Sequence, residues 1–291
     1  MIFWRVGRRF REEDGFALVS VLWGMIVLGV IAAGVVRSSS LSYAVARNGW
    51  ERLGREEALK AGLNRAVLGI MDSRPEKRWR VDGTPSNFDF NGIHATISIQ
   101  DELGRIDLNY ADDALLDGLF RSAGVSEDEA QGLVAKVLDW REPGDQKRLK
   151  GAKRRDYLDA GYSYAPRAGP FQSVDELKLV MGMTNELFDR IKPAITIYSQ
   201  RIQIDRSVAP RETLLALPDM TPAEVDQILA ARKIASSSGV GSPLQSGPGS
   251  LAGRAFSILV KSVDGDEVAE VYEVVRLTGD PIRPVLVQDL E

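Results

Sequence analysis

A run of 21 consecutive residues without a charged side chain, Phe16–Val36, constrains this 291-residue chain more than any other feature. A helix of that length spans roughly 31 Å, which is about the thickness of the hydrocarbon core of a bilayer. Four arginines precede the run between residues 5 and 11, and such an excess on a short flank predicts that this end stays cytoplasmic. The sequence therefore predicts one membrane-crossing helix, with everything after Arg37 on the far side.

The composition excludes several classes of chemistry. The chain has no cysteine and one histidine, His94, so thiolate metal sites, cysteine nucleophiles and multi-histidine sites are ruled out. His94 lies in an alternating apolar run, Ile93–Ile99, and is expected to be an ordinary strand residue. The net charge of -4 supplies no overall basic field for nucleic acid. The composition therefore argues against cysteine- and histidine-based catalysis and gives no overall sign of nucleic-acid binding.

A helical pattern continues beyond the apolar run as far as Ile70. Apolar residues recur at spacings that fit one helix face, while Arg and Glu occupy the other. Such a helix could pack on its own domain or on neighbouring chains. The apolar positions are Leu41, Val45, Leu53, Ala58, Leu59, Leu63, Val67 and Ile70.

Strands and then helices are predicted after the helix-breaking residues around Pro75, Gly83 and Pro85. Residues 93–99 and 103–108 alternate as half-buried strands do. Residues 112–120 and 126–138 then show helical spacing, and Ser126 with Glu129 matches an N-terminal capping box. Trp140, at the end of the second helix, is expected to anchor a core because large aromatic side chains usually pack there.

A helix, tight turn, helix pattern occurs three times: near residues 115–138, again at 177–191, and again at 214–228. These units resemble helix-hairpin-helix or SAM-like modules, which in DNA-binding proteins place backbone amides of a glycine-rich turn against phosphates. The third turn has Asp219 in place of a glycine, and no basic stripe surrounds it. Helices that serve packing and protein contact are therefore favoured over DNA binding.

The last part of the chain predicts a flexible loop and a β-hairpin. Residues 236–250 are rich in Ser, Gly and Pro, a composition typical of flexible segments. Residues 255–261 and 268–276 alternate around Asp264-Gly265-Asp266, which is a strong hairpin signal. These strands would complete the sheet that begins near residue 93.

The residues at the front of the apolar run resemble a prepilin signal. A short basic leader ends in Gly15, and Phe16 opens the uninterrupted apolar helix. This arrangement is similar to that of type IV pilins and type II secretion pseudopilins. The resemblance implies a leader at residues 1–15 that a prepilin peptidase removes between Gly15 and Phe16. Most members carry a glutamate at the fifth mature position; here it is Ser20, and its absence is typical of the minor pseudopilin K family.

Motifs farther along the chain resemble the same family. An aspartate-tryptophan-arginine-acid run begins at Asp139, followed by the stretches Gly151–Tyr157 and Pro170–Leu177, with Leu103–Asn109 ahead of them. The resemblance covers most of the chain and implies an α+β fold. Its parts would be a transmembrane helix at 16–36, a pilin-like helix-plus-antiparallel-sheet domain at 37–108 and 194–291, and an inserted all-helical SAM-like or helix-hairpin-helix domain at 109–193. A helical unit at 207–233 could attach to either part.

The resemblance also implies a function. It is that of a minor pseudopilin at the tip of the type II secretion pseudopilus, taking part in fibre initiation and protein export by assembly and not by catalysis. The implied partners are other minor pseudopilins, the major pseudopilin, the prepilin peptidase and the inner membrane, crossed once with the bulk of the chain periplasmic. Two alternatives are a membrane-anchored, competence-type DNA-binding protein and a hydrolase that uses Asp139 and Glu142. The hydrolase is the weaker alternative, because acidic side chains usually face water without a catalytic role.

No cofactor is required, but the family resemblance implies a candidate calcium site. Its ligands would be Glu142, Asp145 and Asp156, because acidic loops of the family are associated with calcium and Ca²⁺ takes six to eight oxygen ligands. This sequence departs from the pattern at Gly144 and Lys153, where acids are expected. A lysine beside the site would oppose a divalent cation.

Overall fold

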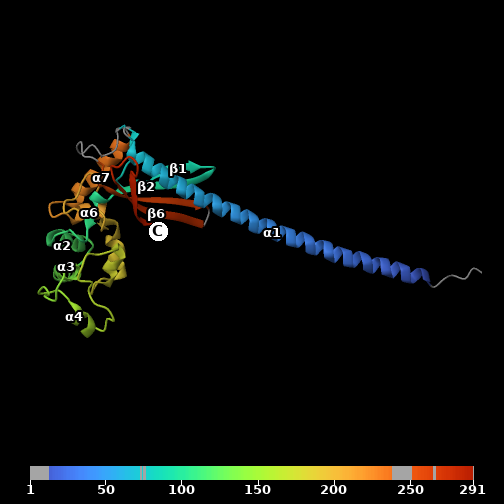
Figure 1. Ribbon diagram of the computed structural model, residues 1–291, viewed down its shortest axis with the longest axis horizontal. Coiled ribbons are helices and arrows are strands. Elements are labelled where there is room, and N and C mark those ends of the chain that lie inside the picture. Colours follow the sequence, from blue (N-terminus) through green and yellow to red (C-terminus); the bar gives the residue numbers. More distant parts are fainter. Residues whose placement is uncertain (1–12, 73, 75–76, 238–250, 265–266, 291) are drawn as a thin grey trace, which may run out of the picture. The chain divides into compact units, whose positions relative to one another are not determined.

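The structure is a computed structural model that describes residues 13–72, 74, 77–237, 251–264 and 267–290 (Figure 1). The chain divides into two compact units, Met1–Glu56 and Glu57–Glu291, each described here by itself. Residues 1–12 of the predicted leader and residues 238–250 of the predicted loop lie outside the described residues.

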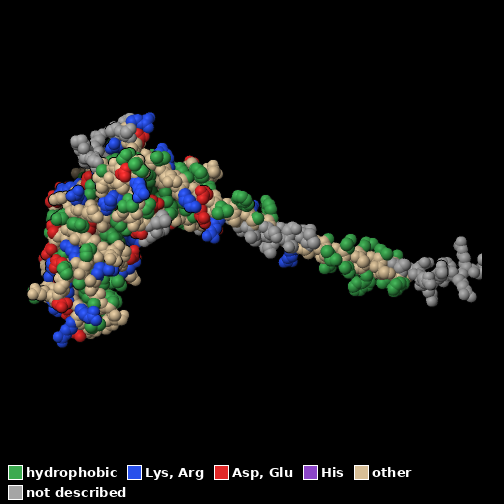
Figure 2. Space-filling model, viewed as in Figure 1, with side chains coloured by type: hydrophobic (Ala, Val, Ile, Leu, Met, Phe, Trp, Pro, Cys, Tyr) green, Lys and Arg blue, Asp and Glu red, His purple; other side chains and the backbone are tan. Residues whose placement is uncertain are grey.

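Helix α1, Glu13–Met71, accounts for all the described residues of the first unit and ends in the second. Farther along the first unit, exposed ion pairs at helical spacing join Arg47 to Glu51 at 2.8 Å and Arg52 to Glu56 at 3.2 Å. Large apolar side chains are exposed along its N-terminal stretch, where Figure 2 shows them in green; they include Phe16, Leu18, Leu22, Trp23, Met25, Leu28, Val30 and Ile31. Within the described part of the chain, no helix is both long and apolar enough to cross a membrane.

The second unit contains a five-stranded antiparallel sheet in the order β1-β2-β5-β6-β7. The predicted hairpin is confirmed, because Asp264 pairs with Glu267 across a two-residue connection. The predicted strand from Ile93 is also confirmed. The bounds are β1 Ser86–Phe90, β2 Ile93–Asp101, β5 Ala255–Asp264, β6 Glu267–Leu277 and β7 Val285–Leu290. Segments far apart in the sequence therefore form one sheet.

One face of the sheet packs against the C-terminal turns of α1, as Figure 1 shows. Alternation along the strands sends every second side chain to this face. The strand residues in this core include Ile97 and Ile99 of β2 and Phe256, Ile258 and Val260 of β5. They pack with the α1 residues Leu59, Leu63, Ala66 and Ile70. Gly62 marks the closest approach, because a Cβ there would lie 2.7 Å from Cγ1 of Val260. A larger residue at this position would force α1 or the Val260 side chain to shift.

A helical region lies between β2 and β5 in the sequence and has its own core. Two short parallel strands, β3 Ile106–Asp107 and β4 Ile195–Thr196, pair at its beginning and end. Leu116, Phe120, Val137, Trp140 and Phe188 are among its buried residues. The elements are η2 Glu102–Gly104, α2 Asp113–Ser122, α3 Glu127–Arg141, α4 Arg154–Asp159, η3 Val174–Leu179, α5 Asn185–Ile191 and η4 Lys192–Ala194.

The third helical unit consists of α6 Arg211–Ala216 and α7 Pro222–Ser237. Helix α6 packs closely on α2, since a Cβ on Gly118 would lie 2.0 Å from the carbonyl oxygen of Ala216. Ala216 belongs to the core of the helical region, whereas Val208, just ahead of α6, belongs to the core of the sheet. The unit therefore contacts both parts, which the sequence left open.

Some predicted details are wrong. Residues 103–108 do not form a strand: η2 turns the chain, and β3 adds only two residues. β1 begins at Ser86, within a segment expected only to break the helix. Ser126 is the N-cap of α3, but it forms no side-chain cap; its hydroxyl donates instead to the Glu129 carboxylate at 2.7 Å. The second helix, tight turn, helix pattern, at residues 177–191, was predicted to begin with a helix; its first element is a 3₁₀ helix, η3.

Candidate functional site

The predicted cleavage position lies at the start of α1. Gly15 and Phe16 are both within the helix, and the Phe16 side chain is 80% exposed. The Ser20 hydroxyl donates to the Phe16 carbonyl oxygen at 2.5 Å, one helical turn earlier. The fifth position of a mature chain would thus carry a neutral group bonded to its own backbone. Cleavage itself stays a prediction.

Asp139 is a buried carboxylate beside the loop that was predicted to bind calcium. Its side chain is 0% exposed, at the end of α3. Arg148 lies nine residues later: its Nη1 donates to Oδ1 of Asp139 at 2.9 Å, and its backbone N–H to Oδ2 at 3.1 Å. The same guanidinium holds Glu142 with two bonds, at 2.7 and 2.6 Å. Arg148 therefore joins two carboxylates, a geometry that planar guanidinium groups favour.

A second cation lies inside the same loop. Lys153 is 6% exposed, and its ammonium donates to the carbonyl oxygens of Asp139 at 2.7 Å and Glu142 at 2.9 Å. Gly151 passes so close that a Cβ there would lie 1.8 Å from Oδ2 of Asp139. The loop is thus folded around two positive side chains.

The three predicted calcium ligands do not meet. Glu142 is bonded to Arg148, and Asp156 accepts from the Lys153 backbone N–H at 2.9 Å and from the Lys147 ammonium. Asp145 is exposed. Arg148 holds the pKa of Glu142 below its usual range, and Lys147 does the same for Asp156. No three Asp, Glu or His side chains of the described chain group into a metal site.

This arrangement does not fit calcium. A Ca²⁺ ion needs six to eight oxygen ligands. The carbonyl oxygens of Asp139 and Glu142 are already bonded to the Lys153 ammonium, the Glu142 carboxylate is bonded to Arg148, and the Asp156 carboxylate is bonded to Lys147. Two cations at these positions would repel a divalent ion.

We therefore expect calcium to leave the stability of this loop unchanged. Adding calcium at about millimolar concentration, the range of weak extracellular sites, or removing it with a chelator should leave the melting temperature of the purified chain unchanged. Calorimetry should show no heat of binding. A rise in melting temperature that saturates with calcium would contradict the assignment of Arg148 and Lys153 as the cations of the loop.

The loop also offers no acid–base pair for hydrolysis. Asp139 is inaccessible and bonded to Arg148, and Glu142 is held as a carboxylate by the same guanidinium. A general acid at neutral pH needs a raised pKa. The hydrolase alternative has no support in this geometry.

Trp140 serves the core, as predicted. Its side chain is 2% exposed and is surrounded by the rings of Tyr157, Tyr164 and Phe171. Its indole N–H donates to Oε1 of Glu176 at 2.9 Å, which satisfies the one polar atom of the ring. Trp140 thus connects α3 to η3, which contains Glu176, and to the segment with Phe171 ahead of it.

The turns of the helical hairpins differ in their ability to approach phosphate. Gly124 and Gly182 have φ angles of 90° and 93°, a conformation that glycine adopts without strain. The turn between α6 and α7 carries Asp219, whose carboxylate accepts from Arg206 at 3.0 and 2.9 Å. A carboxylate at the turn would repel phosphate, so this hairpin is unsuited to DNA.

Comparison with known proteins agrees with the predicted resemblance. Residues 90–200 match the family model described as "Type II secretion system (T2SS), protein K". Two curated proteins named "Type II secretion system protein K", from Pseudomonas aeruginosa and Klebsiella pneumoniae, are each 25% identical over 246 residues. Each alignment covers 76% of this chain, with 73% of the first relative and 76% of the second. The predicted resemblance to the protein K family of type II secretion systems is confirmed.

The protein K family match covers the whole helical region. Residues 90–200 begin at the end of β1 and end just after β4, so they contain every helix from α2 to α5. A solved structure has the same fold: a chain in "The Crystal Structure of the GspK-GspI-GspJ complex from enterotoxigenic Escherichia coli Type 2 Secretion System". The TM-score is 0.53 at 15% identity, over 88% of this chain and 98% of that one.

Proposed function

We propose that this chain is a minor pseudopilin at the tip of a type II secretion pseudopilus, where it takes part in fibre initiation and protein export by assembly. The observation that carries the proposal is the protein K match over the helical region, together with a fold shared with one chain of a three-protein complex. The proposed partners are the other minor pseudopilins and the major pseudopilin. Catalysis is not part of the proposal, because Asp139 and Glu142 are both held by Arg148.

The proposal includes an inner-membrane anchor with the N-terminus cytoplasmic and the bulk of the chain periplasmic. It is supported by the uncharged run Phe16–Val36, the arginines ahead of it, and the exposed apolar side chains of α1. Because no described helix meets the length and apolarity of a membrane span, this part rests on the sequence and on the family resemblance. Exposed apolar side chains in such number need a cover, which a bilayer or neighbouring fibre helices would supply.

Tip placement follows from Ser20 and from the bulk of the helical region. The family resemblance implies that a fifth-position glutamate neutralises the terminal ammonium of an adjoining subunit. An unpaired charge in an apolar bundle costs roughly several kcal/mol. A subunit without the acid therefore suits a position where no earlier subunit's terminal ammonium lies within its reach. The helical region between β2 and β5 would also obstruct regular stacking above this subunit.

Gold labelling of an epitope tests this placement. The epitope goes into residues 236–250, which are rich in Ser, Gly and Pro and should tolerate insertion. We expect one label at one end of each isolated fibre. The same epitope in the major pseudopilin should label the whole shaft, and regular labelling of the shaft through this chain would refute tip placement.

A further inference from the structure

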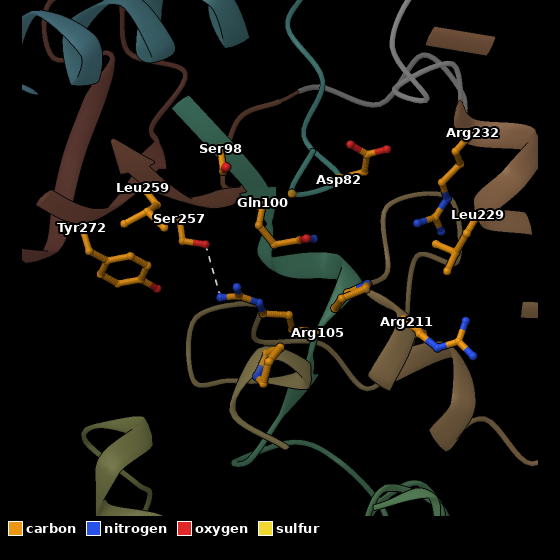
Figure 3. Close-up of a pocket in the computed structure, with 13 residues that line it drawn as sticks. Asp82, Ser98, Gln100, Arg105, Arg211, Leu229, Arg232, Ser257, Leu259 and Tyr272 are labelled. Carbon is orange, nitrogen blue, oxygen red and sulfur yellow. Dashed lines mark hydrogen bonds between the residues drawn. The ribbon is translucent and has the colours of Figure 1, made fainter. Parts of the chain in front are cut away.

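A pocket of about 400 Å³ lies on the face of the sheet opposite α1. Its floor comes from alternate residues of three strands, and α6 and α7 form its other side (Figure 3). The strands contribute Ser98, Gln100, Ser257, Leu259 and Tyr272, and the helices contribute Arg211, Leu229 and Arg232. Pockets of this size, mostly apolar with a few polar groups, are typical of small-ligand sites.

Three arginines line the pocket, and two of them have carboxylate partners. Arg105 donates to Oε1 of Glu102 at 3.1 Å and to the Ser257 hydroxyl at 3.2 Å. Arg211 forms an ion pair with Asp226 at the surface. The lining carboxylate, Asp82, is paired with Arg80. These charges therefore balance one another.

Among the described residues that line the pocket, Arg232 is the cation that has no ion pair with a carboxylate. Its terminal nitrogens donate to two backbone carbonyls, that of Ala209 at 2.7 Å and that of Arg206. Its Nε is buried and has no hydrogen-bond partner. Burial lowers the pKa of Arg232, the nearby charge of Arg80 lowers it further, and the charges of Asp82 and Asp205 offset this only in part. The Nε of Arg105 is likewise buried and has no hydrogen-bond partner among the described residues.

We propose that this pocket binds a carboxylate joined to an apolar group. The carboxylate would accept from the guanidinium of Arg232, supplying the negative charge that this side chain lacks, and the apolar group would lie against Leu229, Leu259 and Tyr272. The carboxylate could belong to a small molecule or to the end of another protein chain; the chemistry of recognition is the same.

Binding of two probes to the full-length chain in detergent tests this inference. The first probe is phenylacetate, and the second is the peptide N-acetyl-Ala-Ala-Phe with a free carboxyl terminus. Each is compared with its neutral amide. We expect each acid to bind at least about tenfold more tightly than its amide, since a charge-assisted hydrogen bond is worth more than a neutral one. A peptide that binds more tightly than phenylacetate indicates a protein terminus; equal affinities indicate a small molecule.

Two variants and a control locate the site. Arg232→Gln should weaken binding of the acids at least about tenfold. Since this change also loses two bonds to backbone carbonyls, Leu229→Trp provides a second variant that fills the pocket and leaves Arg232 intact. Arg201→Gln removes the same charge from an exposed position outside the pocket and should leave binding unchanged. If the acids bind no better than the amides, or if both pocket variants bind the acids as tightly as the unchanged chain does, the inference is overturned.

Discussion

Replacing Arg148 with methionine should lower the free energy of unfolding of the second unit by about 3 kcal/mol. Asp139 is completely buried and Arg148 is its side-chain cation, and removing one partner of a buried pair typically costs about 3 to 5 kcal/mol. We place the effect at the lower end because Arg148 is 35% exposed and the backbone N–H of residue 148 still donates to Asp139.

A matched control is available in the same loop. Lys150 pairs with Asp128 at the surface, where both side chains are exposed, so Lys150→Met should cost less than about 1 kcal/mol. Urea unfolding of both variants, followed by tryptophan fluorescence, measures the difference; Trp140 lies at the end of α3, next to the loop. Equal stabilities of the two variants would show that Arg148 does not stabilise Asp139 as the distances indicate.

The elements that were predicted correctly are those in which one local pattern decides the structure. Residues 93–99 alternate strictly, and their register with β5 places Ile97 and Ile99 on the buried face. The β5–β6 hairpin follows from its turn residues, and α2 and α3 follow from their helical spacing. In each of these segments, local preference and tertiary burial agree.

The elements that were missed depend on contacts with distant residues. Residues 103–108 alternate, yet a Cβ at Gly104 would lie 2.7 Å from the Val208 carbonyl oxygen, so the chain turns there to meet a segment about a hundred residues later. β1 also alternates, with Phe88 and Phe90 on one side, but the preceding Pro85 suggested a loop. No local spacing could reveal either arrangement.

For the loop around Asp139, the sequence pointed to the acids but not to the positive side chains bonded to them. The sequence pointed to the acids around Asp139 and noted Lys153 as a departure, but it could not show that the ammonium of Lys153 and the guanidinium of Arg148 point into the loop. Spacing along a loop does not determine side-chain direction. The pocket that Arg232 lines is even harder to predict from the sequence, because its lining comes from segments that only the sheet topology brings together.

Replacing Gly15 with valine should abolish processing of the chain and, with it, protein export. If the leader ends at Gly15, a β-branched residue beside the scissile bond leaves the basic leader attached to α1. Arg8, Arg9 and Arg11 would then stay ahead of the apolar run, and charged residues of this kind cannot enter a packed apolar helix bundle without a cost of several kcal/mol, roughly. A retained leader should therefore exclude the subunit from a fibre, and no export should remain if the fibre needs it for initiation.

N-terminal sequencing of protein from membranes gives the direct measurement. The unchanged chain should begin at Phe16, and the Gly15→Val chain at Met1. Gly24→Val is a matched control, because Gly24 lies in the same apolar helix with no atom within 4 Å of an added Cβ; it should be processed normally and should support export. A chain that keeps Met1 without any substitution, or one that begins near Arg37, would show that residues 1–15 are not a prepilin leader. If Gly15→Val is processed as well as Gly24→Val, the glycine is not the residue that the peptidase requires.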